Sequence, residues 1–232
     1  MIIMPIPLPV ELKDVVSLVG KFVWQEFQAE RAAEAERILL RKMSRGRPHL
    51  WTQDKTAAAV FTYLRAAQEG VASRNLELMA EALVTAAEEA TFAPDEFRRH
   101  ATRLADLSRE EILLVAELIR CRREAEPTPA PAAAKSDWSG AQVERADDGA
   151  QQAQWDGQIW RKVVESLLAK PAIFADETLI HGYAGALTRT GWISYIGGWD
   201  DGMFRATPLL NAIERLLEWK EAAARANAEA SA

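Results

Sequence analysis

The chain has 232 residues, of which 49% are hydrophobic and 27% are charged, values that are ordinary for a globular protein. Its formal net charge of −6 disfavours a general nucleic-acid binder, because the footprint of such a protein is normally basic. The excess of acid lies in residues 124–232, since residues 1–123 carry equal numbers of acidic and basic side chains.

A long first helix is predicted from just after Pro9 to about Met43. Apolar residues recur at helical spacing in its first half, namely Val10, Leu12, Val15, Val16, Val19, Phe22, Val23 and Phe27. Such a helix would extend about 50 Å, which is longer than a compact domain of this size can cover. We therefore expect part of it to project or to pair with another chain, giving a homodimer or other homo-oligomer. A break near 29–33 is the alternative.

Four further helices are predicted before residue 124. They span about 53–69, 73–90, 94–106 and a stretch that begins after Ser108. Ser108 and Glu111 form a capping-box pattern, in which each side chain satisfies a free backbone donor of the other residue. Ala57, Val60, Phe61 and Leu64 form the expected apolar face of the helix at 53–69. Short connections between helices favour an antiparallel bundle over residues 1–123.

The pattern changes after residue 123. Residues 124–153 contain Pro127, Pro129 and Pro131 and few periodic apolar residues, so we predict a flexible linker. Residues 154–232 then read as helices at 154–169 and 177–190, a β-hairpin with a glycine-rich turn, and a last helix that starts at Thr207 and Pro208. The tail after Lys220 is expected to fray.

The predicted fold is therefore mainly α, with an N-terminal helical bundle and a small C-terminal winged-helix-like α+β module with one β-hairpin. A winged helix can read DNA, with one helix in the major groove. The helix at 177–190 offers His181 and Arg189 for this task, but phosphate binding needs several cations. Asp200 and Asp201 at the turn would also face the phosphates.

Large aromatic residues gather in the same module. Trp192 and Trp199 flank the predicted hairpin, and small β elements often use such side chains as a core. The alternative is that Trp199 and Trp192, together with Arg189 and His181, contact a protein partner, because aromatic residues are favoured at interface hot spots.

A basic cluster lies at the end of the first helix, formed by Arg41, Lys42, Arg45 and Arg47. These charges suit a helix C-terminus, where they complement the helix dipole. The alternative is an anion-binding site.

No pattern of catalytic, cofactor-binding or metal-ligating residues is present. His49, His100 and His181 are far apart in the sequence and lack neighbours at metal-ligand spacing. The one cysteine, Cys121, has arginine neighbours that could lower the pKa of its thiol, but it has no clear histidine partner. A single cysteine makes no intrachain disulfide, and no apolar run approaches the about 20 residues of a membrane span. We expect a cytoplasmic protein that is not an enzyme.

The order of several turns and caps resembles a bacterial family, the abortive-infection alpha proteins. The resemblance rests on Leu104-Ala105-Asp106-Leu107-Ser108-Arg109-Glu110-Glu111, on Leu187-Thr188-Arg189-Thr190-Gly191-Trp192-Ile193 and on the helix start at Thr207, and it covers about half of the chain. It implies a role in phage exclusion and no established catalytic residues. The sequence thus favours a non-enzymatic interaction or regulatory protein. The alternative is a DNA-binding transcriptional regulator that uses residues 177–206.

Overall fold

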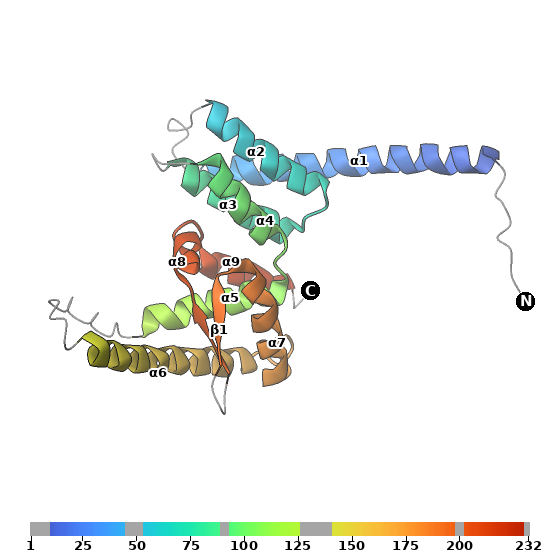
Figure 1. Cartoon of the computed structure of the whole chain (residues 1–232). Helices are drawn as coiled ribbons and strands as arrows, with labels where there is room; N and C mark the ends of the chain where they lie inside the picture. The colour runs from blue at the N-terminus through green and yellow to red at the C-terminus, as the bar shows by residue number, and fades with distance from the viewer. Residues whose placement is uncertain (1–9, 45–52, 89–92, 126–140, 198–201, 230–232) are drawn as a thin grey trace, which may run out of the picture. The chain divides into compact units, whose positions relative to one another are not determined.

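The computed structural model describes residues 10–44, 53–88, 93–125, 141–197 and 202–229, and the side chains of 10–22, 53–56 and 141–151 lie outside this description. The described residues are mainly helical, with one small antiparallel sheet near the C-terminus, which confirms the predicted fold class. The chain divides into two compact units, residues 1–105 and 106–232 (Figure 1).

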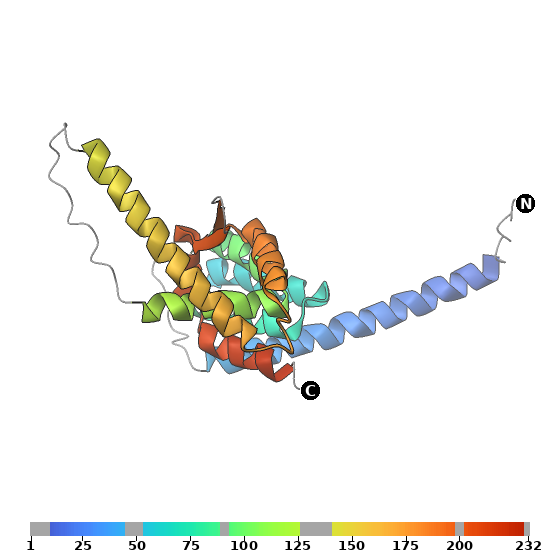
Figure 2. The same cartoon turned by 90° about the horizontal axis from the view of Figure 1, so that it is seen from below.

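The described residues of the first unit form four helices: α1 (Val10–Met43), α2 (Gln53–Gln68), α3 (Ser73–Glu88) and α4 (Pro94–Ala105). Helix α1 is continuous, without the break that was the alternative at 29–33. Its second half packs on α2 and α3, whereas its first half extends past α2, α3 and α4 in both views (Figures 1 and 2).

The core of this unit joins all four helices. Its larger buried residues are Ile38, Leu39, Tyr63, Leu76, Met79, Leu83, Phe97 and Leu104. Two polar side chains fix the packing: the Tyr63 hydroxyl donates to the carbonyl of Ala35, at 3.0 Å, and Asn75 Nδ2 donates to the carbonyls of Leu104 and Ala105, at 3.0 and 2.9 Å. Because buried polar groups need partners, these bonds set how α1 meets α2 and how α3 meets α4.

The second unit begins with α5 (Arg109–Glu124), which we had placed in the N-terminal bundle. Here α5 packs against α9 (Trp219–Glu229), α6 (Ala141–Leu168) and α7 (Glu177–Leu187). Every residue from Ile112 to Ile119 is buried. A helix that is apolar on all sides must be surrounded, and the three neighbours from the C-terminal half surround it.

Helix α6 begins at Ala141, within the region predicted as a linker at 124–153. Residues 141–153 are rich in Ala and Gln and contain no proline, so they suit a helix. The prolines on which the linker prediction rests lie at 127–131, outside the described residues.

The hairpin follows α7 through a short 3-10 turn, η2 (Thr188–Thr190), which Gly191 ends with a φ of 72°. Strand β1 (Ile193–Ile196) pairs antiparallel with β2 (Met203–Ala206), so that Tyr195 stands opposite Phe204. The predicted cap of α7 is present, because Asp176 accepts from the N–H of Leu179. Thr207 precedes Pro208 at the start of α8 (Pro208–Glu214), but its hydroxyl donates to the carbonyl of Gly191 at 2.6 Å and makes no capping bond to the helix.

The last predicted helix is two helices, α8 and α9, and the second continues to Glu229, beyond the predicted fraying point. Trp219, Ala222 and Ala226 recur along one side of α9 and are buried. Since α9 packs on α5, the two alanines allow close approach and hold the tail in place.

Candidate interaction surface

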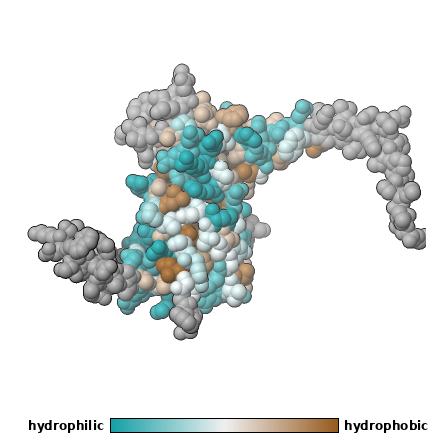
Figure 3. Space-filling view, viewed as in Figure 1, coloured by the Kyte–Doolittle hydropathy of each residue, from teal (hydrophilic) through white to brown (hydrophobic). Residues whose placement is uncertain are grey.

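The part of α1 that extends past α2 carries exposed apolar side chains. Val23 is 58% exposed, Trp24 is 51% exposed, and the Trp24 ring stacks on Phe27 with their centroids 5.6 Å apart. In Figure 3 a small brown patch lies on this part of α1, among teal and white surface. Contiguous apolar surface of this kind commonly marks an interaction site.

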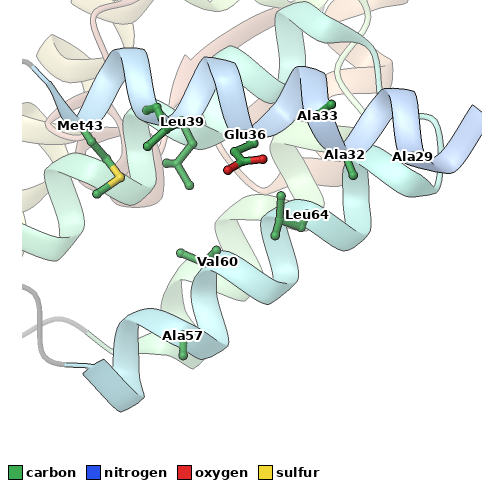
Figure 4. A pocket seen from close by; sticks show the side chains of 10 residues that line it. Ala29, Ala32, Ala33, Glu36, Leu39, Met43, Ala57, Val60 and Leu64 are labelled. Carbon is green, nitrogen blue, oxygen red and sulfur yellow. The ribbon is translucent and has the colours of Figure 1, made fainter.

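An apolar groove runs between the second half of α1 and α2 (Figure 4). Its volume is about 710 Å³. The α1 wall is built from Ala29, Ala32, Ala33, Glu36, Leu39, Leu40 and Met43, and the α2 wall from Ala57, Val60 and Leu64. Among the described residues that line the groove Glu36 is the one charged side chain, so the groove suits an apolar occupant.

The α2 wall corrects the predicted orientation of that helix. We had expected Ala57, Val60, Phe61 and Leu64 to face the core, but none of them is buried, and Phe61 is 68% exposed. The buried face of α2 instead consists of Ala59, Tyr63, Ala66 and Ala67. Small alanines let α2 approach its neighbours closely, and the larger apolar residues are left lining or flanking the groove.

The basic cluster at the end of α1 is ion-paired where it is described. Arg41 Nη2 lies 2.7 Å from Glu77 Oε1, and Lys42 Nζ lies 2.7 Å from Glu81 Oε2. Lys42 and Glu81 are both buried. Arg45 and Arg47 lie outside the described residues. Arg41 and Lys42 therefore join α1 to α3, which leaves them poorly placed to bind a free anion.

Arg189 also has an internal partner. Its guanidinium forms a two-pronged ion pair with the buried carboxylate of Glu111, with Nη2 2.8 Å from Oε2, and it donates to the carbonyls of Asp106 and Ala186. Glu111 completes the predicted capping box with Ser108. Arg189 thus ties η2 to the start of α5, a role that the sequence alone did not reveal.

His181 and Trp192 serve the packing of the second unit. His181 Nε2 accepts a hydrogen bond from Trp160 Nε1 at 3.3 Å, and the His181 ring meets Phe204 edge-on. Trp192 is fully buried against Trp219, so it offers no surface to a partner. Trp199 lies outside the described residues.

Two side chains that could take part in catalysis, Glu117 and Cys121, are respectively ion-paired and buried. A hollow of about 360 Å³ between α5 and α9 is lined in part by Glu117 and Arg120. Burial alone would raise the pKa of Glu117, but hydrogen bonds from Arg120 and Ser166 lower it, so this carboxylate is a paired anion. Cys121 is buried, and burial raises the pKa of its thiol despite the nearby arginine, contrary to the expected lowering.

Among the described residues, no three His, Cys, Asp or Glu side chains gather closely enough to hold a metal ion. None of the described helices has both the length and the apolar character that crossing a membrane requires. No family model, no curated protein and no solved structure matches the chain. The resemblance to abortive-infection alpha proteins therefore stays a prediction.

Proposed function

We propose that this protein is a non-enzymatic interaction or regulatory protein that self-associates through α1. The observation that carries the proposal is the uncovered apolar surface of the first unit. It comprises the exposed side chains of Val23, Trp24 and Phe27 on α1 and the groove that α1 forms with α2.

The energy available from this surface can be bounded. Full burial of a large apolar side chain contributes about 1.5–3 kcal/mol, so each roughly half-exposed residue could still contribute about 1 kcal/mol. Val23, Trp24, Leu40 and Phe61 are all more than half exposed. Association costs roughly 4 kcal/mol or more in lost freedom, so these residues alone make a weak contact. The apolar first half of α1 would supply the rest.

The test of self-association uses the full chain. Sedimentation velocity over a wide concentration range should show a dimer, and Phe61→Glu should weaken it because a charge would enter the uncovered face of α2. Gln68→Glu adds the same charge at another exposed position of α2 and should leave the dimer intact. A monomer at every concentration would refute the proposal.

The DNA-binding alternative finds less support. Arg189 is committed to Glu111, and the exposed positions of α7 include Glu177 but no lysine or arginine. A regulator that makes several phosphate contacts loses affinity steeply as salt rises. A mobility-shift assay with a random duplex library at low salt should therefore show no complex. A complex with a steep salt dependence would favour the alternative.

A role in phage exclusion remains a proposal that rests on the family resemblance alone. It predicts that expression of the gene in a susceptible bacterium lowers the plating efficiency of at least one phage. The matched control is the Phe61→Glu variant, which should lose the effect if self-association is required. Equal plating across a broad phage panel would remove this proposal without affecting self-association.

A further inference from the structure

Helix α1 carries two surfaces that complement each other. Its second half forms one wall of the apolar groove (Figure 4), and its first half extends past α2, α3 and α4 (Figures 1 and 2). In this first half the sequence places Leu12, Val15, Val16, Val19, Phe22 and Val23. Spacings of three and four residues bring these positions to one broad side of a helix.

The length of α1 allows two copies of the chain to cover the groove and the apolar first half of α1 at the same time. Its 34 residues span about 51 Å, and its midpoint falls between Glu26 and Phe27. A two-fold axis across this midpoint would lay the first half of each α1 along the second half of the other. Such a contact uses the same patch on both copies and closes on itself.

We propose that the groove between α1 and α2 is the docking site for the first half of α1 from a second copy, with the two α1 helices antiparallel. This proposal rests on the self-association proposed above and specifies its geometry. In this arrangement position 19 of one copy lies opposite positions 33 and 34 of the other, and position 12 lies opposite 40 and 41.

The chemistry of the groove fits a helix as its occupant. Ala29, Ala32 and Ala33 on the α1 wall are small, so a second helix can approach closely.

The area that the contact would bury reaches that of a stable interface. Burial of a large apolar side chain contributes a free energy that, at about 25 cal/mol per Å², corresponds to about 60–120 Å² of buried surface for each side chain. Six such residues from each copy give about 700–1,400 Å², and the groove walls that they cover add to this area. Specific, stable interfaces bury about 1,200–2,000 Å².

Cross-linking between introduced cysteines tests the direction of the helices. The double variant Val19→Cys/Ala33→Cys should form a covalent dimer with a short bis-maleimide, because positions 19 and 33 of different copies would lie side by side. The single variant Val19→Cys should not, since the two positions 19 would be about 22 Å apart along the helices. The native Cys121 is buried, and the wild-type chain controls for its reaction.

A second pair of variants tests the docking face itself. Val19→Glu should raise the dimer dissociation constant at least 10-fold, whereas Ser17→Glu, on the polar side of the helix, should change it less than 2-fold. Circular dichroism checks that both variants keep the wild-type helix content.

The outcomes separate this inference from the proposed function. Cross-linking of Val19→Cys alone would show parallel helices and overturn the inference while self-association stands. A wild-type dimer in which neither cysteine variant cross-links, or in which Val19→Glu has no effect, would also overturn it. A chain that stays monomeric at every concentration would overturn both proposals.

Discussion

Replacing Glu111 by glutamine should destabilise the second unit and reduce its sensitivity to acid. The buried Glu111 carboxylate accepts from the N–H of Ser108 and from Arg189, both at 2.8 Å, and Ser108 Oγ accepts from the N–H of Glu111 at 3.2 Å. Glutamine has the same shape and can still accept from Ser108, so the change removes mainly the charge that Arg189 meets.

The size of the effect follows from burial. Breaking a fully buried ion pair costs about 3–5 kcal/mol. The Arg189 side chain is 44% exposed, so solvent screens the pair, and glutamine keeps part of the cap. We expect a loss of about 1–2 kcal/mol at pH 7. For a unit of this size that corresponds to a fall of about 3–10 °C in Tm.

The pH dependence has a definite sign. Burial alone would raise the pKa of Glu111, but the hydrogen bonds from Arg189 and Ser108 lower it below its usual value. The unfolded chain has an ordinary glutamate pKa of about 4.3, so it binds this proton first as the pH falls. The stabilisation is therefore complete above about pH 5 and is lost as the pH falls through the folded-state pKa. The difference between wild type and Glu111→Gln should shrink towards pH 3.

Urea unfolding at pH 7 and pH 3, followed by tryptophan fluorescence, measures both effects. Six of the eight tryptophans lie within residues 106–232, so the signal reports mainly on the second unit. Glu110→Gln is the matched control, because Glu110 pairs with its neighbour Arg109 and takes no part in the cap. The reasoning fails if Glu111→Gln is as stable as wild type at pH 7, or if the control costs as much.

Three further predictions concern stability. Gly182→Ala should raise the Tm of the second unit, with a gain of about 0.5–1 kcal/mol, because a Cβ there meets open space in a helix, whereas Gly191→Ala, at a φ of 72°, should lower the Tm. Lys42→Met should cost about 1–3 kcal/mol in urea unfolding, because it removes the buried ion pair with Glu81. Burial lowers the pKa of His100, so its neutral form is favoured in the folded state and stability should fall as the pH drops below about 6.5. His100→Phe should remove this pH dependence of stability, which hydrogen exchange of the α4 backbone amides measures.

Local signals in the sequence predicted several element boundaries. The caps at Ser108 and Asp176, the helix start at Pro208 and the stop at Gly191 all lie where the pattern placed them. Each of these features depends on residues within a few positions of one another, so their physics is visible without tertiary structure.

Features that depend on distant residues could not be predicted in the same way. The partner of Arg189 is Glu111, 78 residues away, and nothing near Arg189 in the sequence marks it. The predicted core face of α2 was wrong. The prediction placed the larger apolar residues in the core, whereas the buried face consists of Tyr63 and small alanines. The stretch from Ile112 to Ile119, apolar except for Glu117, did contain a usable signal, since a helix with apolar residues on nearly every side needs neighbours all around it.

Arg189 and Lys42 each form an ion pair within the protein, and this makes binding of an anion less favourable than binding of an apolar partner. If Arg189 turned outward to a phosphate, Glu111 would remain buried without its counter-charge, and that penalty would offset much of the gain from one phosphate contact. Lys42 is also held in an ion pair with Glu81, so binding an external anion there would first break that pair. The exposed side chains of Val23 and Phe61 already contact water, so covering them disrupts no buried ion pair. Association through the apolar faces of α1 and α2 therefore avoids the internal penalty that anion binding at Arg189 or Lys42 would incur.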